Sequence, residues 1–227
     1  MKDIFIYDDG KAVSRISVGG SLQDIRDAVA SMAETASGLH VVCDRNVKQY
    51  AEPLLAGMGP YLSEPVFIEA SERNKTMSTV MDICGKLTEQ GADRASVVLA
   101  IGGGITTDMA GFAASIYRRG VKFAFIPTTL LAQVDAAIGG KTGVNMDAYK
   151  NMLGVIRQPV RTFICTDFLK SLPYRDFMSG ASEMVKTFLI EDNGFYDRAL
   201  YYLSGLGISD DRTAYMEEHM EELTALI

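Results

Sequence analysis

The sequence predicts an α/β fold, with a parallel-sheet domain over residues 1–172 and the beginning of an all-helical domain over residues 173–227. Two observations carry this prediction. Strand-like and helix-like runs alternate up to Leu172, and the strand-like runs are uniformly apolar, as in SVVLAI at 96–101. That pattern is typical of parallel strands covered by helices on both faces. From Pro173 onward only helical patterns follow.

The elements are expected in the following order along the chain. Strands are predicted at residues 3–7, 12–18, 39–43, 65–70, 96–101, 122–126 and 161–165. From residues 39–43 onward, the strands are expected to be buried. Helices are predicted at residues 21–38, 47–58, 77–90, 107–118, 176–190, 196–203 and 212–227.

Local signals support several of these boundaries. Ser21 with Asp24 three residues later forms a capping-box pattern at the start of the first helix, and Gly38 is expected to close that helix. Pro53 is expected to interrupt the second helix or to start a new one, because proline lacks the backbone N–H.

Composition narrows the class of protein. The net charge of the 227 residues is −7, which argues against nucleic-acid partners. We see no export leader and no apolar run of about 18 residues, so we expect no membrane association. Cys43, Cys84 and Cys165 are widely spaced, which predicts free thiols, a reducing compartment and therefore a cytoplasmic protein.

The densest polar stretch, Ile126 to Asn151, follows an apolar strand. Loops at strand ends commonly carry binding and catalysis in α/β proteins, so we predict that this stretch is the floor of a site for a phosphorylated, hydroxyl-rich substrate. The GGKT at 139–142 is no Walker A loop, because Asp135 stands where that motif needs glycine. Lys141 could simply be a solvated surface lysine. The set of Lys141, Lys150 and Arg119 favours instead several cations that converge on the opening of one substrate site.

GGGITTD at 102–108 lies between a strand and a helix. Its glycines and the free N–H groups of a helix start favour a phosphate contact, although a tight turn alone would also explain them. Asp108, expected in the first helical turn, could simply complement the helix dipole.

Three further groups of polar residues follow, and two of them allow two interpretations. Asp44 and Asn46 after a strand suit either ribose recognition or an Asx turn. Glu72 and Lys75 read by themselves as an exposed ion pair, and Glu183 and Lys186 as either a helix ion pair or a metal ligand beside a substrate cation. His40 and His219 read as ordinary histidines, since neither has a ligand at helical spacing.

Taken in order, the segments GGGITTDMAGFAASIYRRG, IPTTLLAQVDAAIGGKTGVN, KNMLG, QP and GASEMVK closely resemble the 3-dehydroquinate synthase family of sugar-phosphate cyclases. The resemblance covers about Asp44 to Ile190, and Ala136 and Ala137 depart from it where the family commonly has serine after the acid. It implies a Rossmann-like NAD-binding domain, a helical metal-binding domain, and zinc or cobalt as the metal. The family reaction converts 3-deoxy-arabino-heptulosonate 7-phosphate to 3-dehydroquinate, and a homodimer is implied.

The resemblance also assigns roles to residues. The implied NAD contacts are Asp44, Asn46, Glu72, Lys75, Gly103, Gly104, Ile105, Asp108, Thr128, Thr129, Leu131, Lys150, Phe168, Ser171 and Leu172. The implied catalytic and substrate contacts are Arg119, Asp135, Lys141, Asn151 and Lys186, and the implied metal ligand is Glu183.

The family's two metal-binding histidines follow that glutamate in a GHTxGH-like stretch, which the sequence does not reach before Ile227. We therefore expect a truncated chain that keeps much of the cofactor site but lacks the metal and turnover. The alternatives are a deoxy-inosose or valiolone type of cyclase, a metal-dependent polyol dehydrogenase, and a non-catalytic NAD-binding module. A polyol dehydrogenase would leave Lys141 and Lys186 unexplained.

Overall fold

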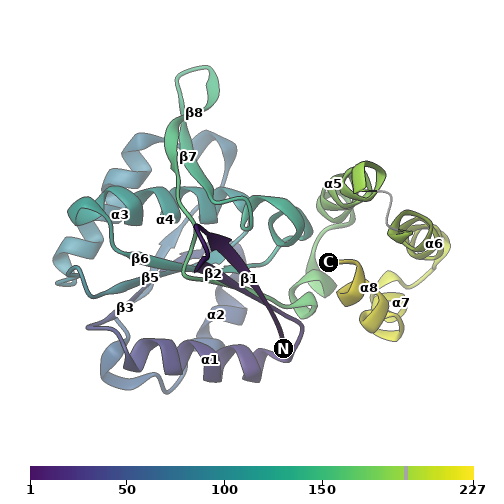
Figure 1. The fold of residues 1–227 in the computed structure, drawn as a ribbon, viewed down its shortest axis with the longest axis horizontal. Coiled ribbons are helices and arrows are strands. Elements are labelled where there is room, and N and C mark those ends of the chain that lie inside the picture. Colours follow the sequence, from purple (N-terminus) through teal and green to yellow (C-terminus); the bar gives the residue numbers. More distant parts are fainter. Residues whose placement is uncertain (192–193) are drawn as a thin grey trace.

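A computed structural model describes residues 1–191 and 194–227, and its centre is a seven-stranded sheet in the order β1-β2-β9-β6-β5-β3-β4 (Figure 1). Every neighbouring pair in this sheet is parallel except β1 and β2, which form a hairpin. The strands are β1 Lys2–Asp8, β2 Lys11–Val18, β3 Leu39–Asp44, β4 Val66–Ile68, β5 Val97–Gly102, β6 Lys122–Pro127 and β9 Arg161–Ile164. The predicted parallel sheet is confirmed.

Helices cover both faces of the sheet, as the apolar strands predict. On one face lie α1 (Leu22–Glu34) and α2 (Lys48–Leu55), and on the other lie α3 (Met77–Glu89) and α4 (Gly104–Ile116) (Figure 1). The side chains of β5 alternate between the two resulting cores, and all six of its residues are buried. Burial on both faces is why this strand has no polar alternation.

Several boundaries differ from the prediction. Helix α1 ends at Glu34 with Thr35 as its cap, so Gly38 does not close it. Helix α2 runs through Pro53 and ends two residues later, so Pro53 neither interrupts it nor starts a new helix. Proline removes only one backbone hydrogen bond this close to the end of the helix, and the burial of Leu54 and Leu55 offsets that loss. Helix α4 begins at Gly104 rather than at residue 107.

Another differing boundary belongs to the strand predicted at residues 65–70. Only Val66–Ile68 is strand, and Val66 and Phe67 are half-buried because β4 is the edge of the sheet. The capping box of Ser21 and Asp24 is present as predicted. The three cysteines are free, also as predicted, and burial raises the pKa of the Cys43 thiol to about 12.

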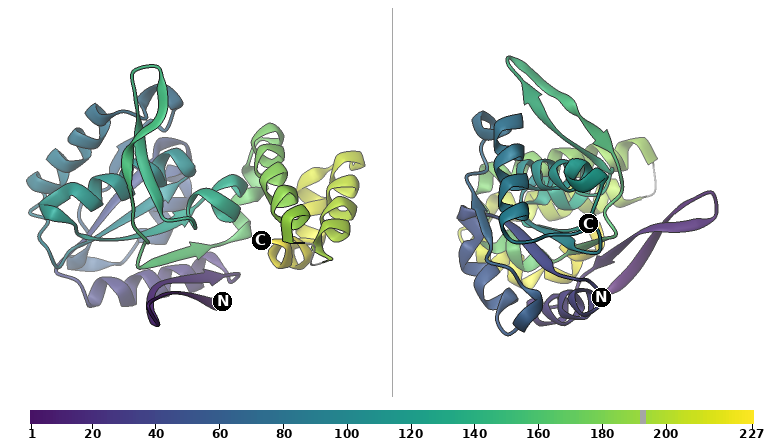
Figure 2. Two further views of the ribbon diagram at one scale, coloured as in Figure 1. Left: turned by 45° about the horizontal axis from the view of Figure 1, so that its top comes forward. Right: turned by 90° about the vertical axis from the view of Figure 1, so that its left-hand side faces the viewer.

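An antiparallel arm, absent from the prediction, rises from the body of the molecule (Figures 1 and 2). It consists of β7 (Lys141–Met146) and β8 (Tyr149–Ile156). Gly143 and Gly154 face each other across it, and a Cβ on Gly154 would lie 2.2 Å from the carbonyl oxygen of Thr142. The two glycines therefore allow the strands to approach closely at the base of the arm.

The remaining helices pack beside the strand ends. They are α5 (Tyr174–Glu191), α6 (Phe195–Ile208), α7 (Arg212–Glu218) and α8 (Met220–Leu226), so the last predicted helix is divided in two at His219. Their core includes Leu130 and Leu169 from the α/β part, which joins the two parts of the molecule. Within the described residues, no helix combines the length and apolarity needed to cross a membrane.

Short helical turns make up the remaining regular structure. The 3₁₀ turns are η1 Arg45–Val47, η2 Gly59–Tyr61, η3 Glu72–Asn74, η4 Tyr117–Arg119 and η6 Thr166–Ser171, and η5 Ala132–Ala136 is a π-helical turn.

Candidate active site

The sheet register brings the predicted polar groups to one edge. Cys43 pairs with Ile101, and Gly102 pairs with Pro127, in parallel strands. The residues that follow these strands, among them Asp44, Gly103 and Thr128, therefore meet at the carboxyl edge of the sheet. Thr128 is also tied directly to this turn, because its N–H donates to the carbonyl oxygen of Gly102 at 3.0 Å.

The glycine turn at this edge leaves its backbone open to a ligand. Gly103 caps α4 without a side-chain hydrogen bond, so N–H groups of the first turn keep their capacity to bind an acceptor. A Cβ on Gly103 would lie 2.9 Å from Cγ2 of Thr129, and one on Gly104 would lie 3.2 Å from Cβ of Ala136. A side chain at either position would crowd these neighbours, so glycine keeps the backbone of the helix start uncovered, as contact with the pyrophosphate of a dinucleotide requires. Half-buried Ile105 packs against the core beneath it.

Asp44 lies beside this turn with its carboxylate partly engaged. Its Oδ1 accepts from the N–H of Asn46 at 3.0 Å and caps the turn η1. Burial raises the pKa of the Asp44 carboxyl above its ordinary value, and hydrogen bonds from backbone N–H groups oppose that rise. The Asx turn is thus present, and the ribose contact of Asp44 stays a prediction.

Lys75 is the centre of a buried polar network. It is only 5% exposed, and its Nζ donates to Oδ2 of Asp108 at 2.5 Å and to Oδ1 of Asn151 at 2.6 Å. Two predictions are therefore wrong. Lys75 pairs with Asp108 and not with Glu72. Asp108 lies in the second turn of α4 and not in the first, so its carboxylate binds Lys75 and does not complement the helix dipole. The turn η3 points Lys75 inward and leaves Glu72 outside.

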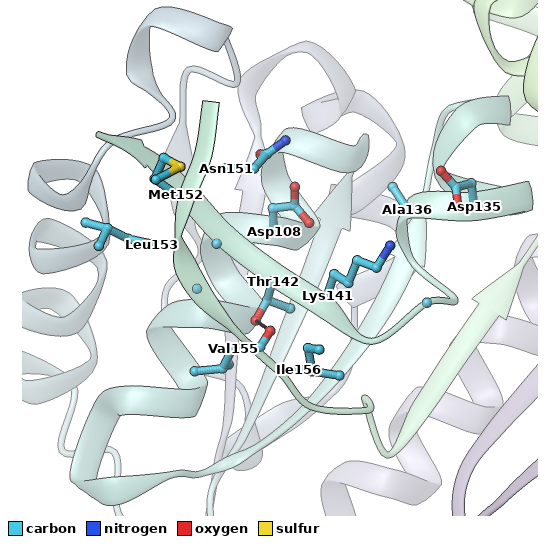
Figure 3. A pocket seen from close by; sticks show the side chains of 13 residues that line it. Asp108, Asp135, Ala136, Lys141, Thr142, Asn151, Met152, Leu153, Val155 and Ile156 are labelled. Carbon is cyan, nitrogen blue, oxygen red and sulfur yellow. Dashed lines mark hydrogen bonds between the residues drawn. The ribbon is translucent and has the colours of Figure 1, made fainter. Parts of the chain in front are cut away.

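A cavity of about 540 Å³ lies between the start of α4 and the arm (Figure 3). Of the predicted residues it is lined by Asp108, Asp135, Lys141 and Asn151. The amino group of Lys141 points toward the segment that carries Ala136 and Asp135 (Figure 3). A cation and an acid on facing walls suit a substrate that combines an anionic group with hydroxyls. The structure therefore brings together the two halves of the stretch Ile126 to Asn151.

Two of the predicted cations lie elsewhere. Arg119 is exposed in η4, beyond the far end of α4 from the cavity, with a left-handed φ of 67°. Lys150 lies on the arm with a 72% exposed side chain, and its Nζ is 3.5 Å from the carboxylate of Glu72. Arg119, Lys141 and Lys150 therefore do not converge on one mouth within this chain, because helix α4 separates the first from the others.

Glu183 and Lys186 form a hydrogen-bonded ion pair on α5. That hydrogen bond raises the pKa of the Lys186 ammonium, with a weaker contribution from Asp135. Among residues 1–191 and 194–227, no three His, Cys, Asp or Glu side chains come close enough to hold a metal ion. These residues alone therefore do not fit a metal centre around Glu183.

The two histidines have ordinary partners, as predicted. Nδ1 of His40 lies 3.0 Å from Oε1 of Gln90, and Nδ1 of His219 lies 3.0 Å from the carbonyl oxygen of Tyr215, whose ring stacks on the imidazole. Both rings are thus accounted for by contacts inside the fold.

The predicted cofactor residues after β9 are mostly enclosed. Phe168 is buried and packs edge-on against Tyr50, whose hydroxyl donates to Oγ of exposed Ser171 at 2.7 Å. Leu172 is half-buried against the helical core. Leu131 is half-buried at the start of the π-helical turn. Ser171 is the residue of this group with most freedom to meet a ligand.

The sequence reasoning missed one polar residue at this site, Asn145. Its amide contacts both Glu72 and Asn151. No clear local signal marked it, because Asp147–Ala148 is not one of the glycine-containing dipeptides that indicate a tight hairpin turn.

Comparison with known proteins agrees with this geometry. A profile described as the N-terminal part of 3-dehydroquinate synthase matches residues 65–179. The 3-dehydroquinate synthase of Alkaliphilus metalliredigens (strain QYMF) is 42% identical over 163 residues, which are 71% of this chain and 46% of that protein. The one of Ruminiclostridium cellulolyticum is 38% identical over 190 residues, which are 82% and 52% of the two chains.

Solved structures show the same architecture. The 2-epi-5-epi-valiolone synthase of Streptomyces hygroscopicus subsp. jinggangensis 5008, with NAD+ and Zn2+ bound, has a TM-score of 0.76 at 28% identity and covers 97% of this chain and 62% of its own. A 2-deoxy-scyllo-inosose synthase complexed with carbaglucose-6-phosphate, NAD+ and Co2+ has a TM-score of 0.73 at 26% identity and covers 83% and 52%.

The chain spans about half the length of the curated relatives it matches. The matching profile runs through α4, the π-helical turn and the arm, which together line the cavity. It extends over half of the chain, from residue 65 to residue 179 of 227. The chain belongs to the 3-dehydroquinate synthase family.

Proposed function

We propose that this chain carries the NAD site and the phosphate-facing part of the substrate site of a 3-dehydroquinate synthase. The reaction converts 3-deoxy-arabino-heptulosonate 7-phosphate to 3-dehydroquinate and phosphate by oxidation, phosphate elimination, reduction and internal aldol closure. The observation that carries the proposal is the single edge where the open glycine turn meets a cavity lined by Lys141, Asp135 and Asn151. Identity of 38–42% to named synthases supports the choice of substrate.

The residues at this edge have distinct tasks in the proposal. Bound NAD would supply the hydride acceptor and donor. Gly103 and Gly104 would offer backbone N–H groups to its pyrophosphate, and Asp44 would accept ribose hydroxyls. Lys141 would hold the substrate phosphate as a charge-assisted donor, and Asp135 would orient hydroxyls across the cavity.

Glu183 and Lys186 complete the proposal on the side of α5. Lys186 would contact the substrate beside Asp135, and Glu183 would offer one carboxylate to a divalent metal. The described residues do not assemble three metal ligands. Arg119 keeps the proposed substrate role, although α4 places it away from the cavity of its own chain. A homodimer in the cytoplasm is part of the same proposal, and light scattering on the purified chain tests the dimer.

The NAD site is tested by calorimetric titration of the chain with NAD. We expect stoichiometric binding, and in Gly103→Ala an affinity weaker by about tenfold or more, since the added Cβ would crowd Thr129 and shift the backbone N–H groups away from the pyrophosphate. Gly91→Asn is the matched control, because Gly91 has a φ of 73° with no neighbour within 4 Å and asparagine tolerates that conformation. A wild-type chain that does not bind NAD would contradict the proposed function.

The substrate site is tested by replacing Lys141 with methionine. Lys141 is exposed, so the fold should be unaffected. In the presence of NAD, the affinity for the heptulosonate phosphate should fall about 10- to 100-fold, the range for one hydrogen bond between charged groups, while NAD affinity stays constant. Lys86→Met, which removes a distant exposed lysine, serves as the control. Equal substrate affinity in Lys141→Met would remove Lys141 from the site.

A further inference from the structure

The arm is fastened to the body of the molecule near its tip. Its ladder is regular from Lys141 to Val144 and then shifts register, so Asn145 has no cross-strand partner. Asn145 instead forms an isolated parallel bridge with Thr76, and its N–H donates to the carbonyl oxygen of Lys75 at 2.9 Å. The irregularity thus turns Asn145 away from the arm and toward the loop after β4.

The side chain of Asn145 uses both ends of its amide. Nδ2 donates to Oε1 of Glu72 at 2.9 Å and, more weakly, to the carbonyl oxygen of Glu72 at 3.4 Å. Oδ1 accepts from the N–H of Asn151 at 2.8 Å. This orientation is chemically required, because a carboxylate only accepts and a backbone N–H only donates. The Asn145 amide also lowers the pKa of the Glu72 carboxyl, as Lys150 and Lys75 do more weakly.

Asn151 is held in an uncommon backbone conformation at this point. Its φ is 54°, in the left-handed region that side chains other than glycine rarely adopt. That conformation directs its Oδ1 to the ammonium of Lys75 at 2.6 Å. A closed ring of contacts therefore runs from Glu72 to Asn145, on to Asn151, and back through Lys75 into the loop that carries Glu72.

We propose that Asn145 is a positioning residue that holds Asn151 in its left-handed conformation and couples the loop of Glu72 and Lys75 to the cavity. The coupling rests on the proposed function, in which that loop meets NAD and Asn151 meets the phosphorylated substrate. A ligand that orders the loop orders Asn151 through the same ring, so each ligand favours the binding of the other by an equal factor. Asn145 itself touches neither ligand.

Whether Asn145 holds Asn151 in place is tested by amide hydrogen exchange measured by NMR. We expect the exposed Asn151 N–H to exchange slowly in the wild type and about tenfold faster in Asn145→Ala, which removes the acceptor. The amides of Val144 and Leu153 should not change, since their ladder is intact. Asn145→Asp keeps an acceptor for Asn151 and should retain the protection. Unchanged exchange at Asn151, or faster exchange along the whole arm in Asn145→Ala, would overturn the proposal.

The coupling between NAD binding and phosphate binding is tested by calorimetry with NAD and inorganic phosphate. In the wild type, NAD should tighten phosphate binding severalfold, and this factor should fall toward one in Asn145→Ala. It should also fall in Asn145→Asp, whose carboxylate repels Glu72 instead of binding it. A factor that is the same in all three proteins would overturn the coupling. If NAD does not bind the wild type, the proposed function and the coupling both fail, and the exchange data still decide whether Asn145 positions Asn151.

Discussion

Lys75→Met is expected to destabilise the folded chain by about 3 kcal/mol, the low end of the cost of breaking a buried ion pair. The side chains of Lys75 and Asp108 are only 7% and 19% exposed. Methionine fills the space of the lysine stem but leaves the Asp108 carboxylate and Oδ1 of Asn151 without their donor. Urea unfolding followed by circular dichroism measures the change as a shift of the midpoint at constant slope.

The matched control is Lys86→Met, which breaks an ion pair with Glu89 whose two side chains are 56% and 67% exposed. Water solvates that pair, so the free energy of unfolding should change far less than in Lys75→Met. The double variant Lys75→Met with Asp108→Leu should regain much of the lost stability, because no buried charge is left unpaired. Equal effects of Lys75→Met and Lys86→Met would contradict the argument from burial.

The pH dependence of the same variant carries a definite sign. Burial raises the pKa of the Asp108 carboxyl, and the hydrogen bond and charge of Lys75 oppose that rise. A carboxyl whose pKa is raised on folding loses stabilising effect as the pH rises from its unfolded value, near 3.8, through its folded value. Without Lys75 the folded pKa should be higher still. The stability difference between Lys75→Met and the wild type should therefore narrow as the pH falls from about 7 to about 5, whereas an unchanged difference would exclude ionised Asp108 as its cause.

Gly180→Ala should destabilise the chain by about 2 kcal/mol, within the range for overpacking. Gly180 lies within α5 where the helix crosses the start of the π-helical turn, and a Cβ there would lie 2.3 Å from the N atom of Leu131. Backbone cannot move aside as a side-chain end can, so α5 must shift away. Lys186 would move with it, away from Asp135, and heat or urea unfolding would report the loss of stability.

Gly85→Ala supplies the opposite sign at a comparable position. Gly85 lies inside α3, and a Cβ there would meet no atom within 4 Å. Alanine favours the helix and restricts the unfolded chain, so stability should rise by about 0.5–1 kcal/mol. If Gly180→Ala also raised stability, helix propensity would outweigh close packing at Gly180 and the packing argument would be wrong.

The α/β part was predictable because its strands are buried on both faces. Apolar runs such as residues 97–101 have no other stable place than a covered parallel sheet, and Ser21 with Asp24 marks a helix start by local hydrogen bonds alone. The edge where Asp44, Gly103 and Thr128 meet follows from the order of those strands. These features depend on short-range pattern, which the sequence displays directly.

The arm and its network were not predictable in the same way. Strand β8 is exposed at every position except half-buried Val155, and each strand of the arm contains a glycine, so neither burial alternation nor strand propensity marks it. Lys75 has two hydrogen-bond partners that lie far from it along the chain. Asp108 is 33 residues away and Asn151 is 76 residues away. Such contacts depend on the three-dimensional arrangement of three elements. The near neighbour Glu72 is the wrong partner because η3 turns the two side chains apart.

The pairing of β2 with β9 has a consequence for how the chain folds. Arg15 and Arg161 are register partners in adjacent parallel strands, although 146 positions separate them. Contacts of such long range are costly in loop entropy and form slowly. On the ribosome, the β1–β2 hairpin emerges before the other strands of this sheet but has no strand to join until β9 has been synthesised. We therefore expect this hairpin to be the last strand pair to dock, and its unpaired edge to be the segment of the sheet most exposed to misassociation during synthesis.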